Sequence, residues 1–222
     1  MRKYLYAVVL VFNKWFGNAQ TTNQQITPSN PNGIKILHSD FIDKNQNEIP
    51  GAIIFTGNVQ VQHNGVLINC NKAYHYTDED YVKAFGNVIL NQGDTIVMNS
   101  RYAEYNGKTL QAFATGNVNL RSPDSNLTTD TIYFDRNKQE AYYRSWGTIL
   151  NKENTLKSKS GRYYLNNKKY VFKTAVTVVN PQVTIKTNNL EFYDNSGHAY
   201  VYGPSTITSK DNVINTTNGF YD

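Results

Sequence analysis

The chain has 222 residues and a single cysteine, Cys70, so its length suits one all-β domain and no intramolecular disulfide can form. The formal net charge is +5, but residues 1–19 hold three basic and no acidic residues, so the rest carries +5 less 3, or +2. Such a small charge gives little support for nucleic-acid binding, and no nucleic-acid partner is expected. Cys70 is interpreted as a small strand side chain rather than a reactive thiol.

Residues 1–19 have the pattern of a secretory signal peptide. Arg2 and Lys3 precede the apolar run YLYAVVLVF at 4–12, and small residues at 17–19 suit cleavage. The apolar run is too short to cross a bilayer as a stable helix. A buried N-terminal helix or strand is the alternative interpretation of this segment.

The rest of the chain is predicted to be a flexible leader followed by one domain. The leader, QTTNQQITPSNPNG at 20–33, is polar and contains two prolines, and the domain covers 34–222. No later apolar run reaches eighteen residues, the length typical of a membrane helix. The sequence therefore predicts an exported protein without a transmembrane helix.

The predicted domain has the features of a long antiparallel β-meander. Runs rich in Val, Ile, Thr and Tyr alternate with turn clusters such as Asn106-Gly107 and Asn180-Pro181. Successive turns lie about 13 to 17 residues apart, and connections this short cannot carry a parallel crossover. The predicted fold class is therefore all-β and antiparallel, and a parallel β-helix is disfavoured.

Two hairpin turns make one repeat of about 29 residues. Its mark is the Gly-Asn-Val in FTGNVQVQ (55–62), FGNVILNQ (85–92) and FATGNVNL (113–120). With half a unit at 34–43 ahead of the first, six units give about thirteen strands. Three later stretches keep the frame without the motif: WGTI (146–149), TAVTV (174–178) and YGPSTI (202–207).

The glycine of each unit is interpreted as a β-bulge or sharp bend in its strand. These strand-bending residues are Gly57, Gly86, Gly116 and Gly147. Alternate residues beyond each glycine fall on one face, so bends at a common depth fold the sheet lengthwise into a trough with a polar outer face. The apolar stripe predicted to line this groove consists of Val59, Val61, Val88, Leu90, Val118, Leu120, Ile149, Val176, Val178 and Ile207.

No catalytic or metal site is predicted. The four histidines, His38, His63, His75 and His198, fall in different units without the spacing of metal ligands. The clustered Asp and Glu residues lie in turns, where they cap the backbone rather than flank a cleft. We therefore expect no cofactor, no metal and no enzymatic activity.

The ordered motifs resemble those of the LptA/OstA family of periplasmic lipopolysaccharide-transport proteins, and more narrowly its OstA-like Bacteroidetes type. The resemblance rests on the three Gly-Asn-Val copies and on the closing segments AYHY, YAEY, TIYFD and LEFYD, and it covers residues 34–222. It implies an elongated, twisted, V-shaped antiparallel β-jellyroll whose apolar interior holds the acyl chains of lipid A. The apolar stripe would then be the lipid-binding groove of a protein in the periplasm, with association with the outer membrane as a further expectation.

The resemblance also implies partners. Open sheet edges would pair with other Lpt-type jellyroll domains, either further copies of the chain or inner- and outer-membrane components. Two departures stand out: the last three units lack Gly-Asn-Val, and the chain stops at FYD (220–222) in the middle of a repeat, as a fragment of a longer protein would.

Two other functions compete with lipid transport. One is a structural or adhesive exported β-repeat protein with a self-filled core. The other is a carbohydrate-binding or carbohydrate-cleaving β-helix, which the short turn spacing disfavours.

Overall fold

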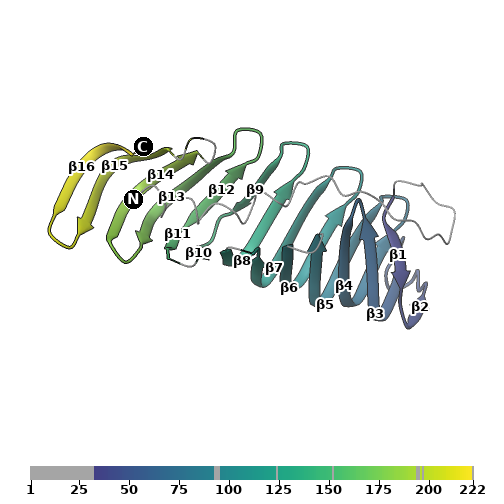
Figure 1. Cartoon of the computed structure of the whole chain (residues 1–222). Helices are drawn as coiled ribbons and strands as arrows, with labels where there is room; N and C mark the ends of the chain where they lie inside the picture. The colour runs from purple at the N-terminus through teal and green to yellow at the C-terminus, as the bar shows by residue number, and fades with distance from the viewer. Residues whose placement is uncertain are drawn as a thin grey trace.

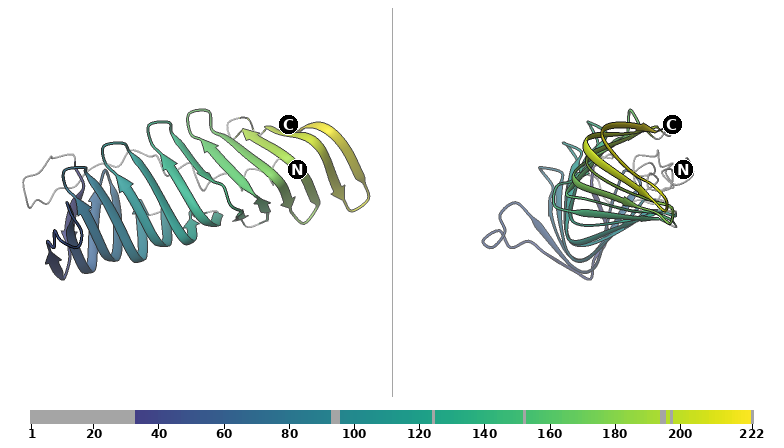
Figure 2. Two further views of the ribbon diagram at one scale, coloured as in Figure 1. Left: turned by 180° about the vertical axis from the view of Figure 1, so that it is seen from behind. Right: turned by 90° about the vertical axis from the view of Figure 1, so that its left-hand side faces the viewer.

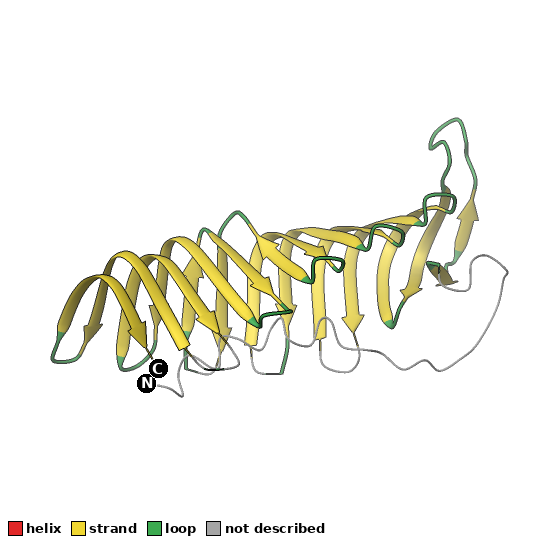
Figure 3. Cartoon of the chain, turned by 90° about the horizontal axis from the view of Figure 1, so that it is seen from above, coloured by secondary structure: helices red, strands yellow, loops and turns green. Residues whose placement is uncertain are grey.

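The computed structural model describes residues 33–92, 96–123, 125–151, 153–193, 196 and 198–221. These residues form one antiparallel sheet of sixteen strands and contain no helix (Figures 1 and 3). The predicted all-β antiparallel jellyroll is confirmed. The signal peptide predicted at 1–19 and all but the last residue of the predicted leader lie outside the described residues.

The strands follow one another across the sheet in chain order, as a meander requires. They are β1 (Lys35–His38), β2 (Phe41–Asp43), β3 (Ile53–His63), β4 (Val66–Tyr76), β5 (Tyr81–Gln92), β6 (Ile96–Asn106), β7 (Gln111–Arg121), β8 (Ser125–Asp135), β9 (Glu140–Tyr143), β10 (Gly147–Asn151), β11 (Thr155–Ser158), β12 (Ser160–Tyr164), β13 (Lys169–Val179), β14 (Val183–Tyr193), β15 (His198–Ser209) and β16 (Val213–Tyr221).

The expected thirteen strands become sixteen because three of them are broken in two. β1 and β2 both pair with β3, β9 and β10 both pair with β8, and β11 and β12 both pair with β13. The central breaks lie beside each other: Trp146, with φ of 54°, donates its N–H to the carbonyl of Lys159, whose own N–H reaches the carbonyl of Thr174. Backbone hydrogen bonds therefore continue from strand to strand across the breaks.

The Gly-Asn-Val motif forms a β-bulge. In β5 the register with β6 shifts between Phe85 and Val88, so that two residues, Gly86 and Asn87, lie opposite the single residue Arg101 of β6. Gly86 and Asn87 have φ of 70° and 47°, in the left-handed region that glycine and asparagine tolerate best. β3 and β7 have the same shift at their own Gly-Asn pairs.

The bulges lie at a common depth, so the sheet bends along its length. Seen along the long axis, the strands form a V that opens to one side (Figure 2, right). The row of bulges is called the fold line. Val59 and Val61 beyond the fold line, and Phe55 before it, belong to the buried hydrophobic cluster. The core therefore lies along the inner face of the V.

The outer face departs from the polar surface that the sequence predicts, because a ladder of half-buried aromatic rings crosses it from β4 to β9. Neighbouring ring centroids are 4.7 to 6.0 Å apart. Phe85 and Phe113 lie an odd number of residues before their glycines and point outward, whereas Phe55 lies two before Gly57 and points inward. The ladder consists of Tyr74, Phe85, Tyr102, Phe113, Tyr133 and Tyr142.

Candidate binding groove

A continuous row of aliphatic side chains, the aliphatic row, crosses the inner face on one side of the fold line. Each member is the register partner of the next. The row is buried from Val61 to Val178, half-buried at Ile207, and 55% exposed at Ile214 in β16. Its members are Ile36, Val61, Ile68, Leu90, Met98, Leu120, Leu127, Ile149, Leu156, Val178, Ile185, Ile207 and Ile214.

The structure places all ten residues of the predicted groove on this face. Six belong to the aliphatic row, and the other four, Val59, Val88, Val118 and Val176, lie one step nearer the fold line with 1% exposure or less. The sequence analysis missed their partners on the returning strands, such as Met98 and Leu127. The same period-two alternation on those strands was the signal that could have found them.

Four alanines, the alanine row, form the opposite wall of the V at its N-terminal end. Ala73, Ala84, Ala103 and Ala114 are successive register partners on β4 to β7, and each is buried. Their short side chains leave a cavity of about 50 Å³ between the two walls, lined by members of both rows. A cavity of this size holds a few water molecules and no acyl chain.

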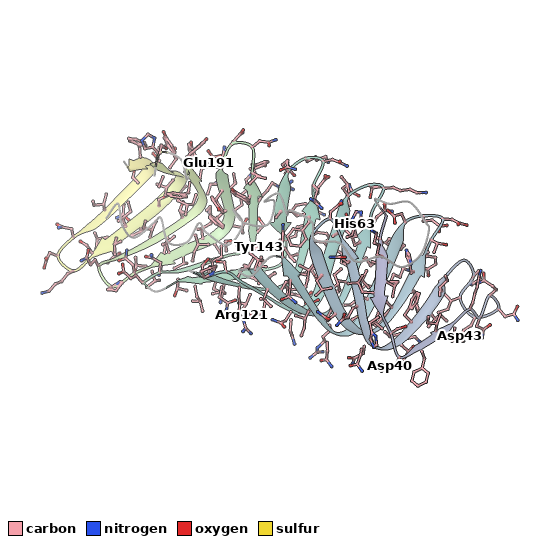
Figure 4. The ribbon with its side chains drawn as sticks, turned by 45° about the vertical axis from the view of Figure 1, so that its right-hand side comes forward. Asp40, Asp43, His63, Arg121, Tyr143 and Glu191 are labelled. Atoms are coloured by element: carbon pink, nitrogen blue, oxygen red, sulfur yellow. The ribbon has the colours of Figure 1, made fainter. Side chains whose placement is uncertain are left out.

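The two walls meet across the open side of the V, here called the mouth. His63 ends β3 on one long side of the V, and Tyr105 lies near the end of β6 on the other long side (Figure 4 labels His63). His63 Nδ1 and the Tyr105 hydroxyl are nevertheless 2.7 Å apart, and the two ring centroids are 5.2 Å apart. This contact closes the trough above the cavity.

Arg136, in the turn after β8, completes the mouth. It hydrogen-bonds to Tyr105 and lines the same cavity. Burial raises the pKa of the Tyr105 hydroxyl, Arg136 opposes that rise, and the charge of Asp80 adds to it. The Tyr105 hydroxyl therefore lies between an imidazole and a guanidinium at the entrance to an apolar space.

Tyrosine side chains fill the middle of the trough. Tyr143 in β9 is 1% exposed, and its ring lies against two glycines, Gly147 and Gly161, where an added Cβ would come within 2.5 Å of the ring (Figure 4 labels Tyr143). Its hydroxyl is 2.6 Å from Ser158 Oγ, and burial raises its pKa to about 12. Tyr143 therefore fills the space beside Gly147 and Gly161 in the middle of the trough.

The predicted bending residues fall into two groups. Gly57, Gly86 and Gly116 have φ of 79°, 70° and 84° and lie in bulges. Gly147 differs, because its φ is not in the left-handed region and its neighbour Trp146 takes the positive φ instead. The position of Gly147 has no room for a side chain, because the Tyr143 ring lies against it.

A row of hydroxyls, which the sequence analysis missed, follows the fold line on the returning strands. Its members recur every 29 residues, and that spacing is the signal in the sequence. Most of them donate to the carbonyl two residues further along, as Ser158 does to Ser160 and Thr187 does to Asn189. These bonds satisfy backbone carbonyls at the bend. The row consists of Ser100, Thr129, Ser158, Thr187 and Thr216.

The C-terminal end of the trough is open. A hollow of about 1020 Å³ spans β13 to β16 and is lined by Val176, Thr187 and Ser205, and also by residues that the register places on the other face, such as Thr177, Lys186 and Thr206. The aliphatic row loses its cover at this end, where Ile214 is exposed. The inner face is therefore clasped at one end, filled in the middle and open at the other end.

Cys70 is a packing residue of this face. It is 5% exposed, and burial raises the pKa of its thiol to about 11. Within the described part of the chain, no cluster of His, Cys, Asp and Glu could hold a metal ion. In that same part, no helix is long and apolar enough to cross a membrane.

Comparison with known proteins identifies the family of this trough. The model of the family described as OstA-like protein matches residues 32–188, more than half of the chain. The chain belongs to the OstA-like family. OstA-like proteins are non-enzymatic transport components, which confirms the prediction that this chain is not an enzyme.

Two further comparisons add little to the OstA-like assignment. No curated protein gives a match. Among solved structures, the chain is similar to LptH from Pseudomonas aeruginosa, described as the LptA-homologous periplasmic component of the conserved lipopolysaccharide transport device. The two chains are 12% identical, and the match covers 57% of this chain and 94% of LptH. The TM-score of this match is 0.42.

Proposed function

We propose that this OstA-like protein is a non-catalytic carrier that holds lipopolysaccharide by its lipid A acyl chains along the inner face of the V. The observation that carries the proposal is the aliphatic row, which runs without a gap from β1 to β16. A groove that must pass a chain along its length needs apolar contacts at every step. Family membership supports a role in transport, with the periplasm as the site of action.

The free energy of binding an acyl chain in this groove is large, so a carrier must keep the chains only partly buried. Burial contributes roughly 0.8 kcal/mol per CH₂, so one twelve-carbon chain gains about 9 kcal/mol before costs. Several fully buried chains would exceed the strongest noncovalent binding, about 20 kcal/mol. A carrier must also release its cargo, so we expect partial burial and movement along the row.

Loading requires the walls to separate. The cavity beside the alanine row is about 50 Å³, and the contact between His63 and Tyr105 lies across its entrance. A single hydrogen bond contributes about 1 kcal/mol, which is small beside the gain from burying an acyl chain. The gain from burying an acyl chain can therefore offset the loss of this hydrogen bond when the mouth opens during loading at the N-terminal end.

The filled middle of the trough supports a second candidate, a structural β-repeat protein with a self-filled core. The tyrosines around Tyr143 fill the middle of the trough, and the remaining cavity is small. Under this alternative the alanine row packs directly against the aliphatic row and no lipid enters. Lipid content separates the two candidates.

The sheet edges are the surfaces we propose for protein partners. Unpaired edge strands present free N–H and C=O groups, and natural proteins protect them unless another strand pairs there. β2 exposes Phe41 and Ile42 by 72% and 69%, and β16 exposes Val213 and Phe220 by 63% and 57%. Other Lpt-type jellyroll domains, or further copies of this chain, would extend the trough at both ends.

The mass spectrum of lipid extracted from the exported, purified protein tests the function. We expect lipopolysaccharide in near-stoichiometric amount. The variant Ala103→Leu places a larger side chain in the groove and should reduce the bound lipid severalfold, with an unchanged far-UV circular dichroism spectrum. Asn99→Leu, on the outer face of the same strand, is the matched control and should retain the lipid. A wild-type protein with no extractable lipid would favour the self-filled core.

A further inference from the structure

The mouth of the trough contains a half-buried arginine without an acidic partner. Arg136 lines the apolar cavity. Its side-chain hydrogen-bond partner is the neutral Tyr105 hydroxyl, and no carboxylate of the described residues forms an ion pair with it. Withdrawing a charge from water without a counter-charge costs free energy, so its position calls for an anion.

The nearby carboxylates have other partners. Glu104 accepts hydrogen bonds from the hydroxyls of Tyr81 and Tyr102. Asp135 accepts from Gln111 and pairs with Lys138 at 3.6 Å. Asp80 accepts from the Ile34 N–H at 2.9 Å, although its charge still reaches Tyr105. The guanidinium is therefore left to face the mouth.

The chemistry of an amphiphile matches this arrangement. Arginine presents planar N–H donors that suit two phosphate oxygens at once. The same cavity is lined by alkyl side chains, among them those of Ala112, Leu90 and Met98. His63 lies across the mouth within hydrogen-bond distance of the Tyr105 hydroxyl that Arg136 also contacts. An anionic head group at this level would place its acyl chains in the cavity.

We propose that Arg136, together with His63 and Tyr105, binds the phosphate of a multiply acylated lipid at the mouth, while the acyl chains enter between the aliphatic and alanine rows. This inference rests on the proposed function and adds a head-group preference to it. The ligand class is a phosphorylated glycolipid such as lipid A. Free phosphate shares the same chemistry and must be distinguished by experiment.

The test compares lipid A with the same lipid A after enzymatic removal of its phosphates, with both affinities measured on the full exported protein. We expect the wild type to bind the phosphorylated form about tenfold more tightly, equivalent to about 1.4 kcal/mol. Arg136→Gln should lose this preference and keep its affinity for the dephosphorylated lipid. Arg121→Gln, which removes an exposed outer-face arginine, should behave as wild type (Figure 4).

Each other outcome has a defined meaning. Equal wild-type affinity for the two lipids overturns the head-group site and leaves the carrier function intact. Failure to bind either lipid overturns the carrier function itself. Saturable binding of inorganic phosphate alone, lost in Arg136→Gln, would assign the site to free phosphate instead. If Arg136→Gln does not fold, Arg136→Lys keeps the positive charge and should retain part of the preference, whereas an unchanged preference would exclude the bidentate contact.

Discussion

The strands bend by different means in the two halves of the trough. The N-terminal half is β3 to β8, and the C-terminal half is β9 to β16. The first half bends at Gly-Asn pairs and sets alanines against the aliphatic row. The second half bends at Trp146, at Thr174 and Ala175, and at Gly203, all with positive φ, and fills its centre with Tyr143. Both halves keep the aliphatic row, so that row is the shared feature and the bend is interchangeable.

This comparison separates backbone requirements from space requirements. Gly116 needs glycine for its φ of 84° and also for space, because a Cβ there would lie 2.8 Å from Arg101 Cβ. Gly203 has φ of 80° but no neighbour within 4 Å. Gly161, whose φ is not in the left-handed region, needs space alone. The three glycines therefore offer three separate tests.

The largest expected effect comes from emptying the filled centre. Tyr143→Ala should lower the free energy of unfolding by about 3–5 kcal/mol, the usual range for a large buried aromatic. Tyr142→Ala, on the outer ladder of the same strand, should cost about 1.5 kcal/mol or less, since it loses mainly ring contacts. Urea denaturation measures both values. Equal losses would mean that Tyr143 is not the central packing residue.

The next effect comes from the bulge of the N-terminal half. Gly116→Ala combines backbone strain with the contact to Arg101 and should lower the free energy of unfolding by about 2–3 kcal/mol. Gly203→Ala carries the strain alone and should cost about 1 kcal/mol. Thermal denaturation of both variants checks the difference, and a reversed order would exclude the packing contribution at Gly116.

A smaller effect of opposite sign is expected in the C-terminal half. Thr174 is β-branched and has φ of 65°. Thr174→Gly should therefore stabilise the protein by about 1 kcal/mol by relieving left-handed strain. Thr177→Gly, at an ordinary strand position of β13, is the control and should destabilise by a similar amount. Stabilisation by neither variant would mean that this bend is not strained.

The last prediction concerns the free energy of unfolding at alkaline pH, and it expects no change at neutral pH. The pKa of Tyr143 is raised from 10.0 to about 12, so the folded protein retains this proton after the unfolded chain has lost it. The stability that this tyrosine contributes is present below about pH 10 and is lost between about pH 10 and pH 12. Tyr143→Phe should reduce that alkaline loss. Burial and hydrogen bonds to Glu104 also raise the pKa of Tyr81 and Tyr102, so part of the loss should remain.

The repeat, its antiparallel strands and its apolar face could all be predicted from the sequence, because hairpin spacing and period-two alternation are local. The inner direction of Val59 and Val88 follows from the same alternation. The mouth could not be predicted, since His63 and Tyr105 are 42 residues apart and meet only through the angle of the V. The outward turn of Phe85 depended on the position of the bulge, and the bend expected at Gly147 lies at its neighbour Trp146, while the Tyr143 ring packs against Gly147.

Photo-crosslinking during export tests the central claim most directly. Crosslinkers placed singly at Val88, Val118 and Val176 should capture lipopolysaccharide, because these side chains lie on the inner face. Crosslinkers at Asn87, Asn117 and Thr177, in the same three strands and outside that face, should not. Equal labelling of the two sets, or none at the three valines in a folded protein, would contradict the lipid-binding groove.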